Sequence, residues 1–188
     1  MLTQDTTIPG WNKKPEEWYW DNIEKGNISK DAPRLPGAWV LIDRTDRPNY
    51  NNGRQLHGSD PFGQMLSKLR KDKKIQSVKG IPETSRFGIS PDELSQAVLP
   101  EIAKLLEVDK SQVRLPKEIE FNVLGNLVYP KWGEAGTSEW FDDNFEGGYR
   151  LVGGDSVGGG LTYVYYYWSD YRHGNFAFRP LVVVSPKA

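Results

Sequence analysis

The sequence of 188 residues contains no cysteine, which excludes disulfide scaffolds, thiolate nucleophiles and cysteine-ligated metal sites together. It also carries almost no net charge, −1 at pH 7, and so creates no long-range field that would attract nucleic acid or an anionic membrane. The basic run 68–74 is short and lies in a helix-like pattern. We therefore expect no nucleic-acid partner.

Long apolar runs are missing as well. No run approaches the roughly 20 apolar residues of a membrane-spanning helix, and residues 1–18 lack the basic start and apolar stretch of a secretory signal. We expect no membrane insertion, and a location that is either cytoplasmic or on a virion or cell surface through another component. The length and the ordinary composition predict one domain over 1–188, with accessory helices in 1–110 and a C-terminal part over 111–188.

Turn residues and apolar spacing predict the secondary structure. Helices are expected over 14–25 and 60–73, and a third begins after the N-cap Ser90, buries Leu105 among its apolar residues and is kinked or divided at Pro100. The short apolar runs 39–42 and 181–184 are predicted to be strands buried on both faces. Glycines divide the chain after 118 into turns and short strands. This order indicates an α+β fold.

The most unusual stretch is 158–184, where five tyrosines lie between Tyr163 and Tyr171. A buried phenol hydroxyl without a partner costs roughly 1–3 kcal/mol, so we expect these tyrosines mostly at a surface. In an extended chain successive side chains point to opposite faces. Alternation predicts a core face with Val164, Trp168, Phe176 and Phe178. The outward face would carry Tyr163, Tyr165, Tyr167, Ser169, Tyr171, His173 and Asn175.

Three stretches follow one another in a recognisable order: RLPKEIEF (114–121), SEWFDDNFEGGYRLVGGDS (138–156) and FAFRPLVV (176–183). Together they resemble the sulfatase-modifying domains of the formylglycine-generating type, which have a C-type lectin fold. The resemblance implies a C-type-lectin-like α+β fold with helical N-terminal elaborations. It also implies that strands near the two ends pair, so 39–42 should lie beside 181–184. The oxidase chemistry of that family needs cysteines, which this chain lacks.

The outward face combines Tyr, Ser, Asp, His and Asn, which a codon of the AAC type yields when its adenines are replaced. Within the glycine and apolar frame of 158–184, this combination resembles the variable region of hypervariable proteins diversified by diversity-generating retroelements. The resemblance implies a receptor-type binding protein, a reverse transcriptase and a template repeat encoded nearby, and a monomer that binds a protein ligand such as a cell-surface molecule without a cofactor or metal. The implied ligand-binding, variable positions are Tyr163, Tyr165, Tyr166, Tyr167, Ser169, Asp170, Tyr171, His173 and Asn175.

Binding suits these residue types, because Tyr offers a large contact area with few rotatable torsions and Ser, Asn and Asp supply adaptable hydrogen bonds. Alternatives remain: the tyrosines are ordinary strand residues, or the chain is a carbohydrate-binding lectin-like module or a non-oxidase relative of the sulfatase-modifying enzymes. Residues 142–144 offer oxygen ligands for calcium, although a surface acidic turn is the simpler interpretation. The intact EPN- or QPD-like motif of calcium lectins is absent.

Enzymatic activity is not expected. His57 and His173 each lie in a loop-like stretch, where a histidine is usually solvated, and no nucleophile, base and orienting group accompany them. Other polar residues have structural interpretations. Glu139 is interpreted as a surface acid beside a core indole, and Arg179 as a buried arginine paired with a carboxylate.

Overall fold

The computed structural model describes residues 1–184, in which helices and strands are both present in an α+β arrangement. The longer helices are α1 (Glu17–Glu24), α2 (Gly63–Lys71), α4 (Leu99–Leu105) and α5 (Glu118–Leu127). The strands are β1 (Trp39–Ile42), β2 (Val113–Arg114), β3 (Ser138–Phe145), β4 (Tyr149–Gly153), β5 (Val164–Trp168), β6 (Phe176–Ala177) and β7 (Leu181–Val184). Short helical turns are α3 (Pro91–Glu93), η1 (Leu94–Val98), η2 (Lys110–Gln112), η3 (Pro130–Gly133) and η4 (Gly160–Thr162).

The three predicted N-terminal helices are confirmed. Ser90 caps α3 in a reciprocal capping box with Glu93, and Pro91 occupies the first turn, as the sequence indicates. Pro100 has no N–H to donate to the preceding turn, and η1, directly before it, is a π-helix that separates α3 from α4. The expectation that Leu105 is buried is wrong, because it lies in the last turn of α4, beyond the part that packs on the core.

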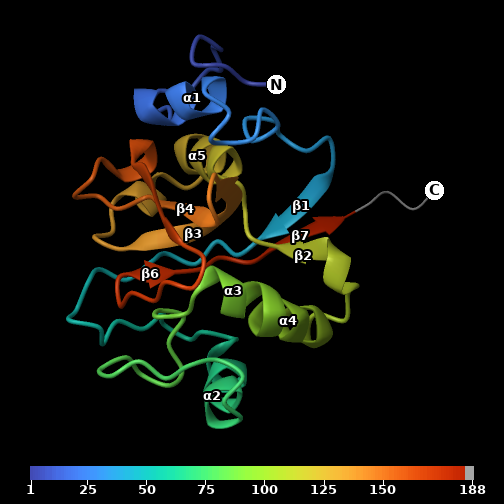
Figure 1. Ribbon diagram of the computed structural model, residues 1–188, viewed down its shortest axis with the longest axis vertical. Helices are drawn as coiled ribbons and strands as arrows, with labels where there is room; N and C mark the ends of the chain where they lie inside the picture. The colour runs from blue at the N-terminus through green and yellow to red at the C-terminus, as the bar shows by residue number, and fades with distance from the viewer. Residues whose placement is uncertain (185–188) are drawn as a thin grey trace.

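Two sheets organise the molecule, with strand orders β1-β7-β2 and β5-β4-β3-β6 (Figure 1). The predicted pairing of 39–42 with 181–184 is confirmed, since β1 and β7 are antiparallel with Trp39 opposite Val184. The prediction that both strands are buried on each face is wrong. β1 is an edge strand with one face toward solvent, so Trp39 is 80% and Leu41 65% exposed, and the end of β7 is exposed too.

The four-stranded sheet is buried on both faces, because neighbouring side chains of β3 and β4 enter different core clusters. Trp140 and Val152 join the cluster that packs against α2 and α4, which we call the α2/α4 core. Phe141 and Leu151 join the cluster beneath α1 and α5, the α1/α5 core. Figure 1 shows α1 and α5 on one side of this sheet and α2 to α4 on the other. Both cores mix residues from 1–110 and 111–188.

A buried ion pair connects the two sheets. Arg179, between β6 and β7, donates two hydrogen bonds to the Glu139 carboxylate at 3.0 and 2.9 Å, and its guanidinium lies 4.1 Å from the centre of the Trp132 ring. Arg179 also donates to the carbonyls of Asp43 and Thr45, which follow β1. Arg179 is therefore the predicted buried clamp, whereas the interpretation of Glu139 as a surface acid is wrong, because its carboxylate is fully buried against Arg179.

Within residues 1–184, no helix is both long enough and apolar enough to cross a membrane.

Candidate ligand-binding surface

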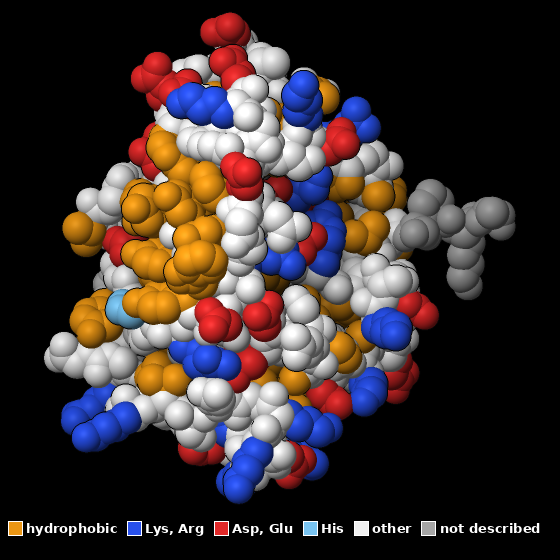
Figure 2. Space-filling view, in the orientation of Figure 1, with side chains coloured by type: hydrophobic (Ala, Val, Ile, Leu, Met, Phe, Trp, Pro, Cys, Tyr) orange, Lys and Arg blue, Asp and Glu red, His pale blue; other side chains and the backbone are white. Residues whose placement is uncertain are grey.

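The tyrosine-rich strand β5 lies at the edge of the four-stranded sheet and pairs only with β4. Its side chains alternate between the two faces, and at this sheet edge Val164 is the one side chain of β5 that a core covers fully. Neighbouring aromatic residues extend this strip, which we call the aromatic surface. It comprises Trp18, Phe145, Tyr149, Tyr165, Tyr166, Tyr167, Trp168, Tyr171 and His173. Figure 2 shows hydrophobic side chains gathered over this side of the molecule.

One half of the aromatic surface rests on α1 and the β3–β4 hairpin. Tyr166 stacks on Phe145 with ring centroids 4.2 Å apart and planes inclined by 5°. Trp18 of α1 lies 5.6 Å from the Tyr166 ring and 6.3 Å from the Tyr165 ring. Glu16 fixes this contact, because its carboxylate accepts a hydrogen bond from the Val164 backbone at 3.1 Å. The N-terminal helix therefore helps to form the surface.

The other half rests on Phe176, which is buried in the α2/α4 core. The Tyr167 ring lies 5.0 Å from Phe176 and 4.9 Å from Tyr171, onto which it stacks. The ring centroids of Tyr171 and His173 are 6.0 Å apart, and those of His173 and Phe176 are 5.0 Å apart. These rings hold one another, so the surface is ordered by its own contacts as well as by the sheet.

The predicted positions differ in how far they reach solvent. Tyr165 is 43% and Tyr171 36% exposed, and Asp170 and His173 are exposed as well. The other five are half-buried: Tyr163, Tyr166, Tyr167, Ser169 and Asn175. The predicted alternation holds for Val164 and Tyr165 but fails by Trp168, which is exposed, and it does not continue beyond Trp168, where β5 ends and turns follow.

Val164, Phe176 and Phe178 of the predicted core face are buried as expected. The prediction that Trp168 is buried with them is wrong. Its side chain is 53% exposed. As the last residue of β5 it lies opposite Tyr149, the first residue of β4, where the sheet extends past the core. Trp168 therefore belongs to the aromatic surface.

Polar contacts tie the loop after β5 to the N-cap region of α3. The Ser169 hydroxyl donates to Asp92 at 3.1 Å, and the Asp92 backbone N–H donates to the Ser169 carbonyl at 3.0 Å. Arg172 donates to Glu93 at 2.9 Å, the same carboxylate that caps α3. Ser169 thus holds the loop in place, while Asp170 and Tyr171 project from it.

Three titratable groups at or beside this surface, Tyr163, Tyr167 and His173, are neutral near pH 7. Burial raises the pKa of Tyr163 and of Tyr167, with further contributions from neighbouring tyrosines and acids, so both hydroxyls remain hydrogen-bond donors. Burial lowers the pKa of His173, whose Nδ1 accepts a hydrogen bond from the Asn175 backbone at 3.1 Å. The accepting Nδ1 places the proton of the neutral ring on Nε2.

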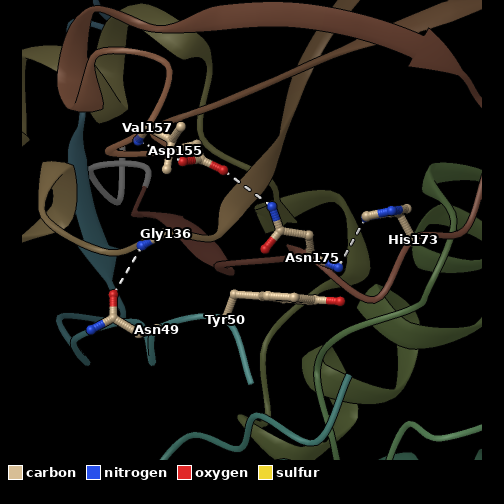
Figure 3. Close-up of a pocket in the computed structure, with 7 residues that line it drawn as sticks. All are labelled: Asn49, Tyr50, Gly136, Asp155, Val157, His173 and Asn175. Carbon is tan, nitrogen blue, oxygen red and sulfur yellow. Dashed lines mark hydrogen bonds between the residues drawn. The ribbon is translucent and has the colours of Figure 1, made fainter. Parts of the chain in front are cut away.

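A cleft of about 590 Å³ borders the aromatic surface at His173. Figure 3 shows the side chains that line it, which come from four separate segments: Asn49, Tyr50, Gly136, Asp155, Val157, His173 and Asn175. The Asn175 amide donates to Asp155 at 3.1 Å, and the Gly136 N–H donates to the Asn49 side chain at 3.0 Å. The cleft therefore joins two predicted positions to residues of the scaffold.

His57 and residues 142–144, the alternative candidate sites, have structural roles. His57 is buried beside Phe87, and burial together with Arg86 lowers its pKa to about 4, so the expectation that it is solvated is wrong. Residues 142–144 lie within β3 rather than in a surface turn, and Asp143 accepts a hydrogen bond from the Glu118 backbone. Among residues 1–184 no three His, Asp or Glu side chains are grouped so as to hold a metal ion.

Sequence reasoning missed four members of the aromatic surface: Trp18, Phe145, Tyr149 and Trp168. One signal was present, because Trp18, Tyr19 and Trp20 are consecutive in α1 and a helix cannot bury three successive side chains equally. Tyr19 and Trp20 are buried, which leaves Trp18 for the surface.

Comparisons with models of known protein families, with curated proteins and with solved structures give no significant match to this chain. The class of the protein is therefore argued from its own residues.

Proposed function

We propose that this chain is a receptor-type binding protein whose variable surface is diversified by a retroelement, and that its scaffold is C-type-lectin-like. The observation that carries the proposal is the aromatic surface, in which exposed and half-exposed tyrosines form one continuous patch on an edge strand. Aromatic side chains of this kind form the energetic centre of many protein interfaces. The ligand we propose is a protein.

The support for a lectin-like scaffold is the pairing of strands from the two ends of the chain, β1 with β7, beside a second sheet that carries the tyrosines. Along β5, the residues that stabilise the fold also differ from those proposed to bind the ligand. Val164 is buried in the α1/α5 core, whereas its neighbour Tyr165 faces solvent. A scaffold of this kind tolerates replacement of the exposed set, because surface substitutions usually change stability by within about ±0.5 kcal/mol.

A genomic observation tests the diversification. The DNA encoding 158–184 should have a near-identical repeat beside a reverse-transcriptase gene, and the two copies should differ only where the template has adenine. A repeat that differs at other bases, or the lack of any repeat, would contradict diversification by a retroelement.

A display experiment tests binding. One phage library randomises the four exposed predicted positions, Tyr165, Asp170, Tyr171 and His173, and a matched control library randomises four exposed positions on α2 and α4. Both are selected against the same purified proteins, hen lysozyme and maltose-binding protein. We expect folded binders from the first library at much higher frequency. Equal yields from the two libraries would show that the aromatic surface has no special capacity to bind proteins.

A further inference from the structure

The cleft beside the aromatic surface contains the carboxylate of Asp155, which interacts with the buried Arg47 through charge but not through a direct contact. Asp155 accepts hydrogen bonds from the Val157 backbone at 2.8 Å and from the Asn175 amide at 3.1 Å, one on each oxygen. Among the described residues it forms no salt bridge within 4.0 Å. Each carboxylate oxygen can accept a second hydrogen bond. Asp155 therefore retains capacity for a donor from a ligand.

The remaining lining groups favour a donor as well. The Asn175 Oδ1 is shielded from solvent and accepts no hydrogen bond from residues 1–184, whereas its amide nitrogen is used by Asp155. Figure 3 shows this oxygen on the side of Asn175 away from Asp155. The lining includes no lysine and no arginine, and His173 is neutral near pH 7. The cleft thus offers the Asp155 carboxylate as an acceptor, whereas the shielded Asn175 Oδ1 is reached only if the Asn175 side chain moves.

Two rings complete the lining. Tyr50 is 53% exposed, and His173 stacks onto Tyr171 of the aromatic surface. A cation over an aromatic face is attracted by the quadrupole of the ring, and a planar guanidinium also stacks on it. The volume of the cleft lies within the usual range for ligand sites, about 300–1,000 Å³. It has room for a whole side chain.

We infer that this cleft receives a cationic side chain, an arginine or a lysine, from the protein that occupies the aromatic surface. The inference rests on the proposed function for the source of the side chain, but the site itself is formed by Asp155, Asn175 and Tyr50. Arginine binds better than lysine, because its guanidinium donates to the carboxylate in a fork and stacks on the rings. The partner protein therefore presents a basic residue at the edge of its apolar contact.

The test is a titration of the ¹⁵N-labelled chain followed by amide chemical shifts. The probes are N-acetyl-arginine amide, N-acetyl-lysine amide, the neutral analogue N-acetyl-citrulline amide, and methyl α-glucopyranoside for a saccharide. We expect the arginine probe to shift the amides of Gly136, Val157 and Asn175 with a millimolar dissociation constant. Lysine should bind more weakly and citrulline weakest, and raising the ionic strength should weaken both cations.

Variants separate the charge from the shape of the cleft. Asp155→Asn should weaken the arginine probe roughly tenfold, the scale of a charge-assisted hydrogen bond, and Tyr50→Leu should weaken it roughly threefold, the scale of an exposed cation–π contact. Asp170→Asn, which removes an exposed carboxylate outside the cleft, should leave the affinity within twofold. Tyr50→Leu keeps the Asp155 hydrogen bonds, so it tests the site even if Asp155→Asn perturbs the loop.

Three results would overturn the inference: no shift with either cation, equal affinity for citrulline, or tighter binding of the saccharide. Failure here is distinct from failure of the proposed function. If the display library yields protein binders but the cleft does not bind the cationic probes, the proposed binding surface is kept and only the cation site is refuted. Cation binding without any display binders would keep the cation site and remove the proposed protein-binding function.

Discussion

The Trp168 ring lies on the Tyr149 ring, with centroids 3.8 Å apart and planes inclined by 28°. The two residues face each other across β4 and β5, at the end of the sheet where the core stops. Trp168 is thus held by a surface contact, and it belongs with the exposed tyrosines to the aromatic surface.

Two tryptophans of the same sheet should therefore differ in their contribution to stability. Trp168→Ala should lower the free energy of unfolding by about 1 kcal/mol, the scale of one aromatic pair. Trp140→Ala should lower it by roughly 3–5 kcal/mol, because Trp140 is fully buried and a cavity remains. Urea denaturation measures both. If the two variants lose equal free energy of unfolding, Trp168 contributes to stability as a core residue does, and its assignment to the surface is wrong.

The sequence predicts what depends on local signals and misses what depends on distant ones. The cap at Ser90 and the division of the helix near Pro100 are local, and the structure has the cap and a π-helix that ends two residues before Pro100. The end of β5 is not local, since the Ser169 backbone is held by Asp92 and by the hairpin carbonyl of Gly148. The point where the core stops along β5 is not local either, so alternation predicts a buried Trp168 that the structure exposes.

In the candidate site, too, the sequence predicts the local features and misses those that depend on distant residues. The tyrosines are visible as a sequence run, and the structure places them on one edge strand. The burial of Glu139 depends on Arg179, a residue 40 positions away, and the cleft needs segments around 49, 136, 155 and 175. No spacing rule within one sequence brings such segments together.

The buried ion pair gives a second prediction. Glu139→Ala leaves Arg179 buried without its carboxylate, and loss of one partner of a buried pair typically costs about 3–5 kcal/mol. The control is Asp72→Ala, which breaks the exposed pair with Lys68 and should leave the urea midpoint unchanged. A small loss for Glu139→Ala would mean that water reaches Arg179. The double variant Glu139→Leu with Arg179→Leu should recover little of the loss, because the buried Arg47, 3.9 Å from the Glu139 carboxylate, also loses its acid.

Asp143 and Glu118 should contribute a stabilisation that falls as the pH rises from about 4 to about 7, against an opposite contribution from His57, whose pKa burial lowers to about 4. Burial raises the pKa of Asp143 to about 7 despite its hydrogen bond from the Glu118 backbone, and burial raises the pKa of Glu118 as well. The folded state therefore binds a proton that the unfolded state has released above pH 4, and this stabilisation is lost as Asp143 ionises. The opposite effect of Asp43, whose pKa is held at about 2 by Arg86 and Thr45, lies at lower pH.

Thermal unfolding between pH 4 and pH 7.5 measures this dependence. Asp143→Asn should remove the falling contribution, so that stability rises more, or falls less, with pH than in the parent chain, because the amide does not titrate and its oxygen can still accept from the Glu118 N–H. Asp46→Asn, at an exposed position, should leave the slope as it is in the parent chain. A parent slope that persists in Asp143→Asn would assign the titration to another buried acid.

The last prediction concerns how far binding residues and folding residues are separated on β5. Tyr165 and Tyr171 are the most exposed tyrosines of the predicted set, so replacing both with Ser should lower the free energy of unfolding by no more than about 1 kcal/mol. Tyr166→Ser is the matched control, a single tyrosine on the opposite face of the same strand. Its ring stacks on Phe145 and Trp18 and packs against the α1/α5 core, so its loss should cost about 2 kcal/mol or more.

Tyr163 and Tyr167 are left out of the double variant because both are half-buried. Urea denaturation compares the two variants with the parent chain, and binders selected from the display library supply the second measurement. In binders that retain Tyr165 and Tyr171, the double variant should abolish ligand binding while the fold is kept. If the double variant unfolds as readily as Tyr166→Ser, the exposed tyrosines stabilise the fold themselves, and a surface that must vary freely at these positions is no longer a sound interpretation.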